Sequence, residues 1–478
     1  MRNGPGSELS LYLKIAQALE AKIRDGALRV GDRLPSIRSL RRQQEVSIST
    51  VLQAYFWLEN RGCVEARPQS GFYVRVPFSD LIPEPAFEAS KPTPTEVSAG
   101  AVLIEMMKAA SDPAKVPFGA ACPAPELFPN RKLSQIIQAI ARQMPWHSSH
   151  YEPPAGSEAL RRQIARRALD FGCSFSPGDI IVTCGAMEAL NLGLRAAARP
   201  GDVIAIESPT YFGLLQAIES LGIRAIEIPT HPRLGMDLDL LEQMVRKHRI
   251  KVCMAMTNCH NPLGFVLPEE RKKELVELTA RHEVALIEDD IYGDLAFEGR
   301  PKSAKAFDRK GLVLLCASFS KVLAPGYRVG WIHAGRFRAE VERLKLISTI
   351  STPTLPQLTV ARFLESGGYD RYLRRLRTAF AEQVHMVSRA AAKYFPEGTR
   401  ITRPAGGYLL WVEFPKRVDA FKLYRSAQAE NISISPGPIF SASGRFKNHV
   451  RMNCGHLWSD RLDRALLTLG KLAEKARQ

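Results

Sequence analysis

Six short apolar runs rich in valine and isoleucine follow one another between residues 178 and 320, with helical patterns between several of them. The runs are GDIIVTCGA, DVIAIESP, IRAIEIP, KVCMAMTNCH, EVALIEDD and LVLLCASFS, and the helical stretches include EALNLGLRAAA and PEERKKELVELTARHE. Strands of a parallel sheet are buried on both faces, so they read as continuous apolar runs joined by crossover connections. The alternation therefore predicts an α/β domain with a largely parallel sheet and helices on both faces.

Polar residues stand where these apolar runs end. In an open α/β sheet, ligands bind outside the carboxyl ends of the strands, so side chains at these positions are candidates for one common site. The candidates are Gly185, Tyr211, Asn261, Asp289, Tyr292 and Lys321.

Lys321 lies in the segment SFSKVLAPGYR, directly after the last apolar run. It is either a solvated loop lysine or an amine that binds an aldehyde cofactor as a Schiff base. Pyridoxal 5′-phosphate requires such a lysine, an acid at its ring nitrogen, partners for its phenolic oxygen, a stacking ring and a phosphate cup. The chain offers Asp289 for the ring nitrogen, Asn261 and Tyr292 for the phenolic oxygen, Tyr211 for stacking, the helix start Gly185-Ala186-Met187 for the phosphate, and Ser318, Ser320 and Arg328 to complete the phosphate site. Their joint presence favours the cofactor over the solvated loop.

Residues 115–475 also resemble the fold-type-I aminotransferases, with motifs in that family's order. The motifs are YEPPAGSEALRRQIA, NPLG, EDDIYGDL, SFSKVLAPGYRVGW, PAGGYLLWVE and VRMNCG. The resemblance implies that Lys321 is the internal-aldimine lysine, that Asp289 is the partner of the pyridine nitrogen, and that Arg451 grips a substrate carboxylate. It assigns the same roles as above to Asn261, Tyr292, Arg328 and Tyr211.

Two further features follow from this resemblance. Tyr151 matches a tyrosine that reaches the phosphate of the neighbouring subunit, which implies a homodimer. Ala186 and Met187 occupy phosphate-cup positions where many relatives have a hydroxyl or amide side chain, so here the backbone donors remain and two side-chain bonds are missing.

The first 76 residues show a different pattern. The stretch LYLKIAQALEAKIRD predicts a helix over 11–25 that ends at Gly26, with one apolar stripe formed by Leu11, Ile15, Leu19 and Ile23. A second helix starts at Ser36, and a third starts after Ser47, with Val46 and Val51 at hydrophobic-staple positions. CVEARPQSGFYVRV then alternates like two strands around a turn. Three helices and a hairpin give the order of a winged helix-turn-helix, which binds DNA; the alternative is a helical cap with a solvated, charged face.

Residues 8–76 resemble the DNA-binding domain of GntR-type bacterial regulators, through LPS-x-R, VS-x-x-TV, L-x-x-x-G and G-x-x-V in that order. The resemblance implies binding to a double-stranded DNA operator. The expected contacts are Arg33, Ser36, Arg38, Ser47, Ser49, Thr50, Gln53 and Gly71. Ile48 departs from the family, which often has a basic residue directly after the capping serine.

The composition changes at PFSDLIPEPAFEASKPTPTEVSAG, which is rich in proline, serine, alanine and threonine. Such a stretch is typical of a semi-extended linker. We therefore expect a winged helix-turn-helix domain over residues 1–76, a linker over 77–100 and an aminotransferase-like domain over 101–478.

Charge and cysteine usage indicate what kind of partner and which cellular location to expect. The net charge of +17 favours a polyanionic partner, and residues 1–76 hold 12 lysines and arginines against 7 acidic residues. No run is apolar enough to span a bilayer and no signal-peptide pattern is present, so we expect a cytoplasmic protein with no membrane partner. The 8 cysteines form no CxxC pair, as expected for reduced thiols. Cys253, Cys259 and His260 match no common zinc spacing, so no metal is expected.

A GntR-type module joined to an aminotransferase-like domain resembles the MocR-type regulators. That resemblance implies a bacterial transcription factor, often a head-to-tail dimer, that senses pyridoxal phosphate or an amino compound bound to it as an external aldimine. The first alternative is a working aminotransferase with an accessory amino-terminal module, and the second is an inactive scaffold with retained motifs. Residues 1–76 favour the regulator, since a metabolic enzyme does not need them.

Overall fold

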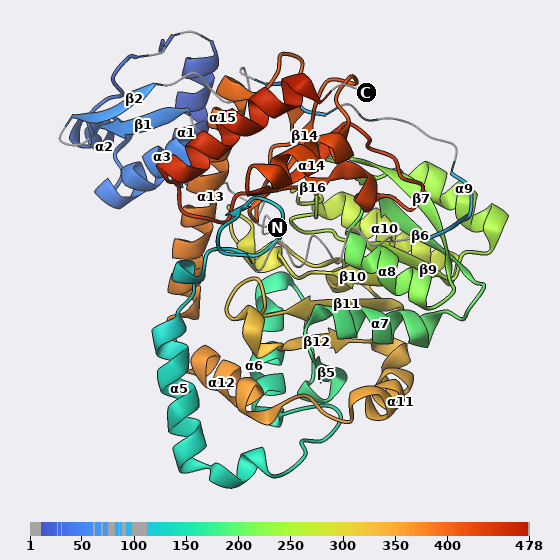
Figure 1. The fold of residues 1–478 in the computed structure, drawn as a ribbon. Coiled ribbons are helices and arrows are strands. Elements are labelled where there is room, and N and C mark those ends of the chain that lie inside the picture. Colours follow the sequence, from blue (N-terminus) through green and yellow to red (C-terminus); the bar gives the residue numbers. More distant parts are fainter. Residues whose placement is uncertain are drawn as a thin grey trace, which may run out of the picture. The chain divides into compact units, whose positions relative to one another are not determined.

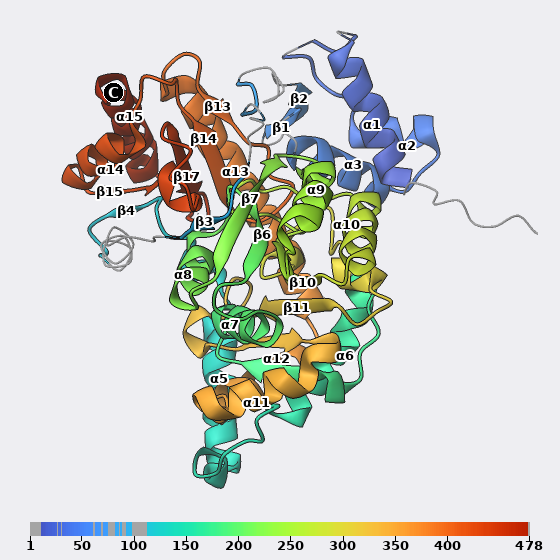
Figure 2. The ribbon, with the colours of Figure 1, turned by 90° about the vertical axis from the view of Figure 1, so that its right-hand side faces the viewer.

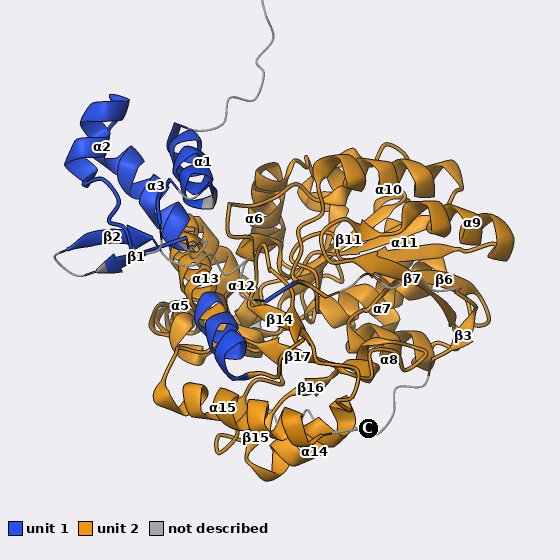
Figure 3. Cartoon of the chain, turned by 90° about the horizontal axis from the view of Figure 1, so that it is seen from above, with its two compact units in different colours: residues 1–83, 385–394 blue, residues 84–384, 395–478 orange. Residues whose placement is uncertain are grey.

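The structure is a computed structural model of the chain. It describes residues 11–25, 27–29, 31–60, 63–67, 70–74, 82–85, 87, 92–97 and 112–476. Within these ranges no helix is long and apolar enough to cross a membrane. The chain divides into two units, one of residues 1–83 with 385–394 and one of residues 84–384 with 395–478 (Figure 3).

The first unit contains the three predicted helices and the predicted hairpin. They are α1 (Leu11–Arg24), α2 (Ile37–Gln44), α3 (Ile48–Asn60), β1 (Val64–Arg67) and β2 (Gly71–Val74). Both predicted helix starts are confirmed, because Ser36 Oγ accepts the backbone N–H of Ser39 at 3.1 Å and Ser47 Oγ accepts that of Thr50 at 3.1 Å. The predicted end of the first helix at Gly26 lies outside the described residues.

The core of this unit forms where the helices meet the hairpin. Three members of the predicted stripe on α1 are buried, namely Ile15, Leu19 and Ile23, and they pack with Val51, Ala54, Tyr55 and Leu58 of α3. Leu11, the fourth member of the stripe, is 55% exposed. It is the first residue of α1, and the core begins one turn further along the helix. Strands β1 and β2 pair antiparallel, with Arg67 opposite Gly71.

The second unit holds the remaining elements, except that the last ten residues of α13, 385–394, belong to the first unit (Figure 1). From residue 84 the helices are α5 (Asn130–Gln143), α6 (Glu158–Ala168), α7 (Ala186–Ala197), α8 (Phe212–Ser220), α9 (Leu238–His248), α10 (Glu269–Arg281), α11 (Arg338–Thr349), α12 (Thr354–Glu365), α13 (Tyr369–Tyr394), α14 (Ala420–Ala429) and α15 (Asp460–Lys475). The strands are β3 (Thr95–Glu96), β4 (Val116–Pro117), β5 (Ile180–Thr183), β6 (Val203–Ser208), β7 (Arg224–His231), β8 (Gly235–Met236), β9 (Val252–Ala255), β10 (Ala285–Asp289), β11 (Val313–Ser318), β12 (Gly330–His333), β13 (Arg400–Ile401), β14 (Leu409–Glu413), β15 (Ile432–Ser433), β16 (Ser435–Pro436) and β17 (His449–Asn453).

The six predicted apolar runs form the strands β5, β6, β7, β9, β10 and β11 of one large sheet, whose order is β3-β7-β6-β9-β10-β11-β12-β5. The pairs from β7 to β11 are parallel. Strand β12, which the sequence did not predict, pairs antiparallel with both β11 and β5. Strand β5 therefore points in the same direction as the central strands. A second sheet, β13-β14-β17-β16, was also not predicted.

Helices cover both faces of the large sheet, as predicted. Successive residues of β6 belong to different cores: Ile204 and Ile206 pack with the side chains of α7 and α8, while Val203 and Ala205 pack with those of α9 and α10. Figure 2 shows α8 on one side of β6 and β7, with α9 and α10 on the other. Burial on both faces explains why these strands are continuously apolar in sequence.

Candidate functional site: a lysine and phosphate-binding turn

The predicted site residues lie at or just after the carboxyl ends of strands that point the same way. Asp289 is the last residue of β10, and Ser318 is the last residue of β11. The other positions follow their strands within a few residues: Gly185 after β5, Tyr211 after β6, Asn261 after β9, and Lys321 after β11. The sheet topology therefore brings residues more than 130 positions apart to one edge.

Lys321 lies in the turn after β11. Its Nζ donates to the carbonyl oxygen of Ala121 at 2.6 Å, and the hydroxyl of Tyr408 donates to the same oxygen at 3.1 Å. Burial lowers the pKa of the Lys321 amine to about 8, and the positive charges of Arg451 and Arg328 act in the same direction. With this pKa about a tenth of the amine is neutral, and therefore nucleophilic, at pH 7, compared with less than about a thousandth for a solvated lysine.

Asp289 lies close enough for its charge to act on the pKa of Lys321. Burial raises the pKa of the Asp289 carboxyl to about 7, against the lowering effect of the backbone N–H of Ile291, which donates to Oδ1 at 3.2 Å. A carboxyl with this pKa can share a proton with a ring nitrogen when one is placed beside it. Tyr292, three residues later, is buried, and its ring meets that of Tyr408 edge-on at 5.7 Å between centroids.

The turn after β5 has the shape of an anion cup. Gly185 caps α7 with a φ of +81°, and the first backbone N–H groups of the helix, on Ala186 and Met187, point out of its start. A Cβ at Gly185 would lie 2.5 Å from Nη2 of Arg328, which donates to the carbonyl of Cys184 at 3.1 Å. Glycine therefore lets the guanidinium lie directly against the helix start.

Hydroxyl groups complete the wall of this cup. Ser318 Oγ lies 2.9 Å from Ser320 Oγ and donates to the carbonyl of Val329 at 2.9 Å, and Arg328 Nη1 donates to Ser320 Oγ at 3.3 Å. Both serines are buried. The predicted phosphate-site residues thus form one connected group.

Arg451 is a buried cation on β17, a strand of the second sheet, and it is 1% exposed. It donates to Asn261 Oδ1 at 3.4 Å, to Ser435 Oγ at 3.1 Å and to the carbonyl of Gly119. Its Nε is buried without a hydrogen-bond partner. Burial lowers the pKa of Arg451, and the phenol groups of Tyr292 and Tyr211 oppose that shift.

The site carries more positive charge than the chain itself neutralises. Among the described residues, no carboxylate lies within 4 Å of the charged nitrogens of Lys321, Arg328 or Arg451, whereas several other buried cations have one. A buried cation without a counterion is costly, so the arrangement suits anionic ligands. The residues present fit a phosphate at Arg328 and the Gly185 turn, an aldehyde at Lys321, a ring nitrogen at Asp289 and a second anion at Arg451.

A salt bridge that the sequence did not predict supports the turn between β5 and α7, which is the predicted phosphate site and is called the phosphate turn below. Glu188, in the first turn of α7, accepts the backbone N–H of Cys184, and Lys345 on α11 donates to its Oε2 at 3.0 Å. Lys345 is fully buried. An acidic residue in a first helical turn is a recognisable signal in sequence, but no local pattern pairs it with a lysine 157 positions away.

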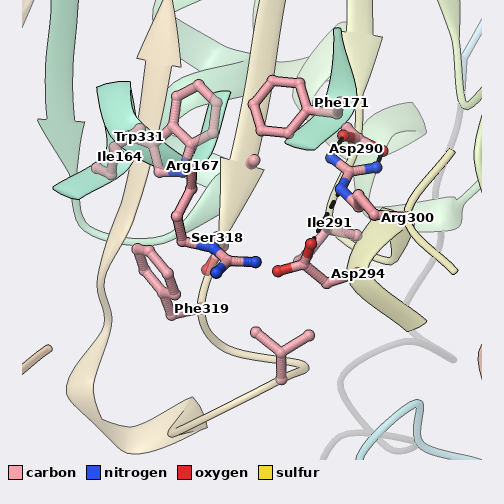
Figure 4. A pocket seen from close by; sticks show the side chains of 12 residues that line it. Ile164, Arg167, Phe171, Asp290, Ile291, Asp294, Arg300, Ser318, Phe319 and Trp331 are labelled. Carbon is pink, nitrogen blue, oxygen red and sulfur yellow. Dashed lines mark hydrogen bonds and ion pairs between the residues drawn. The ribbon is translucent and has the colours of Figure 1, made fainter. Parts of the chain in front are cut away.

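An ion-pair cluster behind the site holds the end of β10. Figure 4 shows Arg300 between Asp290 and Asp294, and it pairs with both carboxylates, at 2.9 Å for Asp294. The hydroxyl of Tyr369 lies 3.1 Å from Asp294 Oδ2. Asp290, Asp294 and Arg300 line a cavity of about 40 Å³, far too small for a cofactor. Because Asp290 directly follows Asp289, the cluster anchors the backbone next to Asp289.

Tyr151 and the cysteines that were considered as metal ligands have separate environments. Tyr151 is 82% exposed, and its proposed contact with a neighbouring subunit stays a prediction. Cys253 and Cys259 are buried free thiols, and burial raises the pKa of the Cys259 thiol to about 12. In the described part of the chain, no three side chains of histidine, cysteine, aspartate or glutamate gather in a way that could hold a metal ion.

The predicted DNA contacts lie on the surface of the first unit, except Thr50, which is half-buried. The exposed ones are Arg33, Ser36, Arg38, Ser47, Ser49, Gln53 and Gly71. Gly71 has a φ of +110°, and a Cβ there would lie 3.3 Å from Nε of Arg33, so the glycine brings this arginine against the hairpin. Contact of these residues with DNA stays a prediction.

Comparison with known proteins agrees with this division. Bacterial regulatory proteins of the gntR family match residues 11–74, and the aminotransferase class I and II family matches residues 127–469. The HTH-type transcriptional regulator YdcR of Escherichia coli (strain K12), itself described as uncharacterized, is 39% identical over 97% of this chain and 99% of its own. YjiR of the same organism, likewise uncharacterized, is 38% identical over 98% and 100%. The crystal structure of LysN, an alpha-aminoadipate aminotransferase from Thermus thermophilus, superposes with a TM-score of 0.73 at 29% identity, covering 79% of this chain and 95% of that one.

Proposed function

The chain belongs to the MocR-type regulators of the GntR family, in which a winged helix-turn-helix is joined to a fold-type-I aminotransferase-like domain, and on that premise we propose that an amino compound held at the Lys321 site changes its binding to an operator. The observation that carries this proposal is Arg451, a fully buried guanidinium that no carboxylate among the described residues neutralises.

The cofactor of this family is pyridoxal phosphate, which supplies a reversible covalent bond to primary amines when it is bound. The Lys321 Nζ provides the attachment point, and Asp289 holds a proton at the ring nitrogen. Arg328 and the backbone N–H groups at the start of α7 hold the phosphate. Asn261 and Tyr292 hold the phenolic oxygen.

Arg451 selects the effector. A guanidinium fork binds a carboxylate or a sulfonate through two parallel hydrogen bonds, whereas a simple amine offers it nothing. Exchange of its present bond to Asn261 for bonds to the effector would also alter the partners of that amide. The effector is therefore an amino acid or a similar amino-bearing anion.

Effector binding would change DNA binding through the arrangement of the two chains of a dimer. A ligand shifts a conformational equilibrium only by binding one state better than the other. In a head-to-tail homodimer, with Tyr151 completing the partner's phosphate site, such a shift changes the spacing of the two helix-turn-helix modules and hence the fit to two operator half-sites. We propose the domain limits 1–76 and 101–478, joined by a linker over 77–100, and a cytoplasmic location, where the operator is.

A second candidate is amino-group transfer. Lys321, with its pKa lowered to about 8, can take and return a proton at neutral pH, which transamination requires. The protein named LysN in the comparison is an aminotransferase. Both functions use the same amine, so only turnover separates them.

The test measures visible absorption and DNA binding of the full chain in parallel. Wild type, loaded with pyridoxal phosphate, is titrated with a panel of amino acids while its binding to its own upstream DNA is followed by fluorescence anisotropy. We expect one amino acid to shift the visible band without turnover and to change DNA affinity severalfold. Lys321→Ala should lose both responses, and Arg451→Gln should lose the amino acid but keep the cofactor. Arg309→Gln, at an exposed arginine, is the matched control. Rapid amino transfer to a 2-oxo acid with no DNA binding would contradict the proposal.

A further inference from the structure

The third helix of the DNA-binding unit carries no positive charge. Helix α3, with the sequence ISTVLQAYFWLEN, contains no lysine or arginine, and Glu59 is its single charged residue. In the helix-turn-helix geometry, this is the helix whose first residues lie in the major groove. Guanine is read there by the bidentate donors of arginine or lysine. Helix α3 has no such side chain.

The outward face of α3 carries an apolar stripe instead. Ile48, the first residue of the helix, is 46% exposed, and Leu52 and Phe56 follow it at intervals of four residues, half-buried and exposed respectively. Residues four apart on a helix lie on one face. Ser49 and Gln53 form an exposed polar stripe beside it.

The hydroxyl groups around Ile48 are already committed to the helix start. Ser47 Oγ caps the helix and lies 2.7 Å from both Ser49 Oγ and Thr50 Oγ1. This network fixes the first turn. The Ile48 side chain therefore projects from a fixed backbone, with fixed hydroxyl groups on both sides.

The surroundings of this apolar side chain indicate a nucleic acid rather than an apolar protein surface. The preceding helix α2 presents the exposed arginines Arg38, Arg41 and Arg42, and Arg33 lies exposed just before it. Positive charges of this kind bind phosphates and carry no sequence preference. Among the base edges of the major groove, only the thymine 5-methyl group is apolar.

We propose that α3 reads A·T base pairs, with Ile48 packed against a thymine 5-methyl group and Gln53 available for an adjacent adenine, while the arginines of α2 hold the backbone. This inference rests on the proposed DNA binding. It explains why the position after the capping serine is apolar in this chain. The operator half-site should therefore place thymine opposite Ile48.

The experiment first selects bound DNA from a random-sequence library with the full-length protein. Each thymine of the selected half-site is then replaced singly by deoxyuridine, which removes only the methyl group. We expect the substitution at one position of each half-site to weaken binding about fourfold, which corresponds to the loss of one buried methyl group. Ile48→Ala should bind the thymine probe about as weakly as wild type binds the uracil probe, and should no longer distinguish the two. Leu11→Ala, an exposed leucine that also begins a helix, is the matched control and should keep the wild-type discrimination.

A wild-type protein that tolerates deoxyuridine at every thymine would overturn the assignment, as would an Ile48→Ala variant that keeps the full methyl effect. Selection of guanine opposite the start of α3 would do the same. In each of these cases the protein still binds DNA, so the proposed function stands. Failure to select any DNA would instead overturn the proposed function and this inference together.

Discussion

Replacement of Lys345 by methionine tests whether the phosphate turn depends on a distant salt bridge. Lys345 Nζ donates to Glu188 Oε2 at 3.0 Å, and to the hydroxyl groups of Thr349 at 3.0 Å and Thr352 at 2.9 Å. The lysine is fully buried, and the Glu188 side chain is 12% exposed. Methionine fills a similar volume but leaves the carboxylate without its cation.

The expected loss follows from the geometry of the pair. At 3.0 Å and an effective dielectric constant near 20, the attraction is about 5 kcal/mol, and removal of one partner from a buried pair typically costs about 3–5 kcal/mol. Glu188 lies in the first turn of α7, so its freed charge also opposes a phosphate at that helix start. We therefore expect a loss of about 3 kcal/mol in unfolding free energy, with pyridoxal phosphate bound at least about tenfold more weakly.

The assay combines urea unfolding of the cofactor-free chain, hydrogen exchange of α7 and an absorbance titration with pyridoxal phosphate. The double variant Lys345→Met, Glu188→Gln is the control, because glutamine still accepts the backbone N–H of Cys184 and removes the orphaned charge. It should recover to within about 1 kcal/mol of wild type. A single variant with wild-type stability and cofactor affinity, or a double variant no better than the single, would refute the reasoning.

Three further outcomes are expected. Gly330→Ala places a Cβ 2.5 Å from the carbonyl carbon of Gly185. It should lower the free energy of unfolding by about 3 kcal/mol or more and abolish cofactor binding in an absorbance titration. Gly326→Ala, where a Cβ meets nothing within 4 Å, should do neither. The rate at which Lys321 combines with pyridoxal phosphate, measured by stopped-flow absorbance, should rise with pH to a plateau with a midpoint near pH 8, because only the neutral amine reacts. A midpoint near pH 10 would show that burial does not lower the pKa of this amine. Tyr55→Phe should lower the stability of the first unit by about 1 kcal/mol, since the hydroxyl donates to the carbonyl of Pro35 at 2.5 Å, and unchanged hydrogen exchange in α2 and α3 would contradict this.

The order of elements was predictable from the sequence because local patterns determine it. A strand buried on both faces has to be continuously apolar, and a helix start needs a side-chain acceptor, so β10, β11 and the caps Ser36 and Ser47 could be recognised without any long-range information. The same holds for the residues that end the strands. Parallel strands bring their carboxyl ends to one edge, so chain order alone predicted that Asp289 and Lys321 would meet.

Other features depended on contacts between segments far apart in the chain. Strand β12 pairs antiparallel between β11 and β5, and the four residues of β12 are too few to show a period. The exposure of Leu11 depends on where the core of the first unit begins. The lowered pKa of Lys321 depends on how much protein surrounds it, which no residue near it in sequence reveals.

What the sequence by itself determined was the order of the elements and the residue types at the candidate site: an amine, an acid and a glycine turn at the ends of parallel strands, a later arginine, and an amino-terminal helix-turn-helix module. What only the tertiary structure decided was the balance of charge. Arg451 has no acidic partner among the described residues, whereas Lys345 has Glu188, and both are fully buried. Burial strengthens electrostatic interactions and makes an unpaired charge costly, and burial is a property of the folded chain. The fold therefore decides that Lys345 is paired within the protein, whereas Arg451 is left available for an anionic ligand.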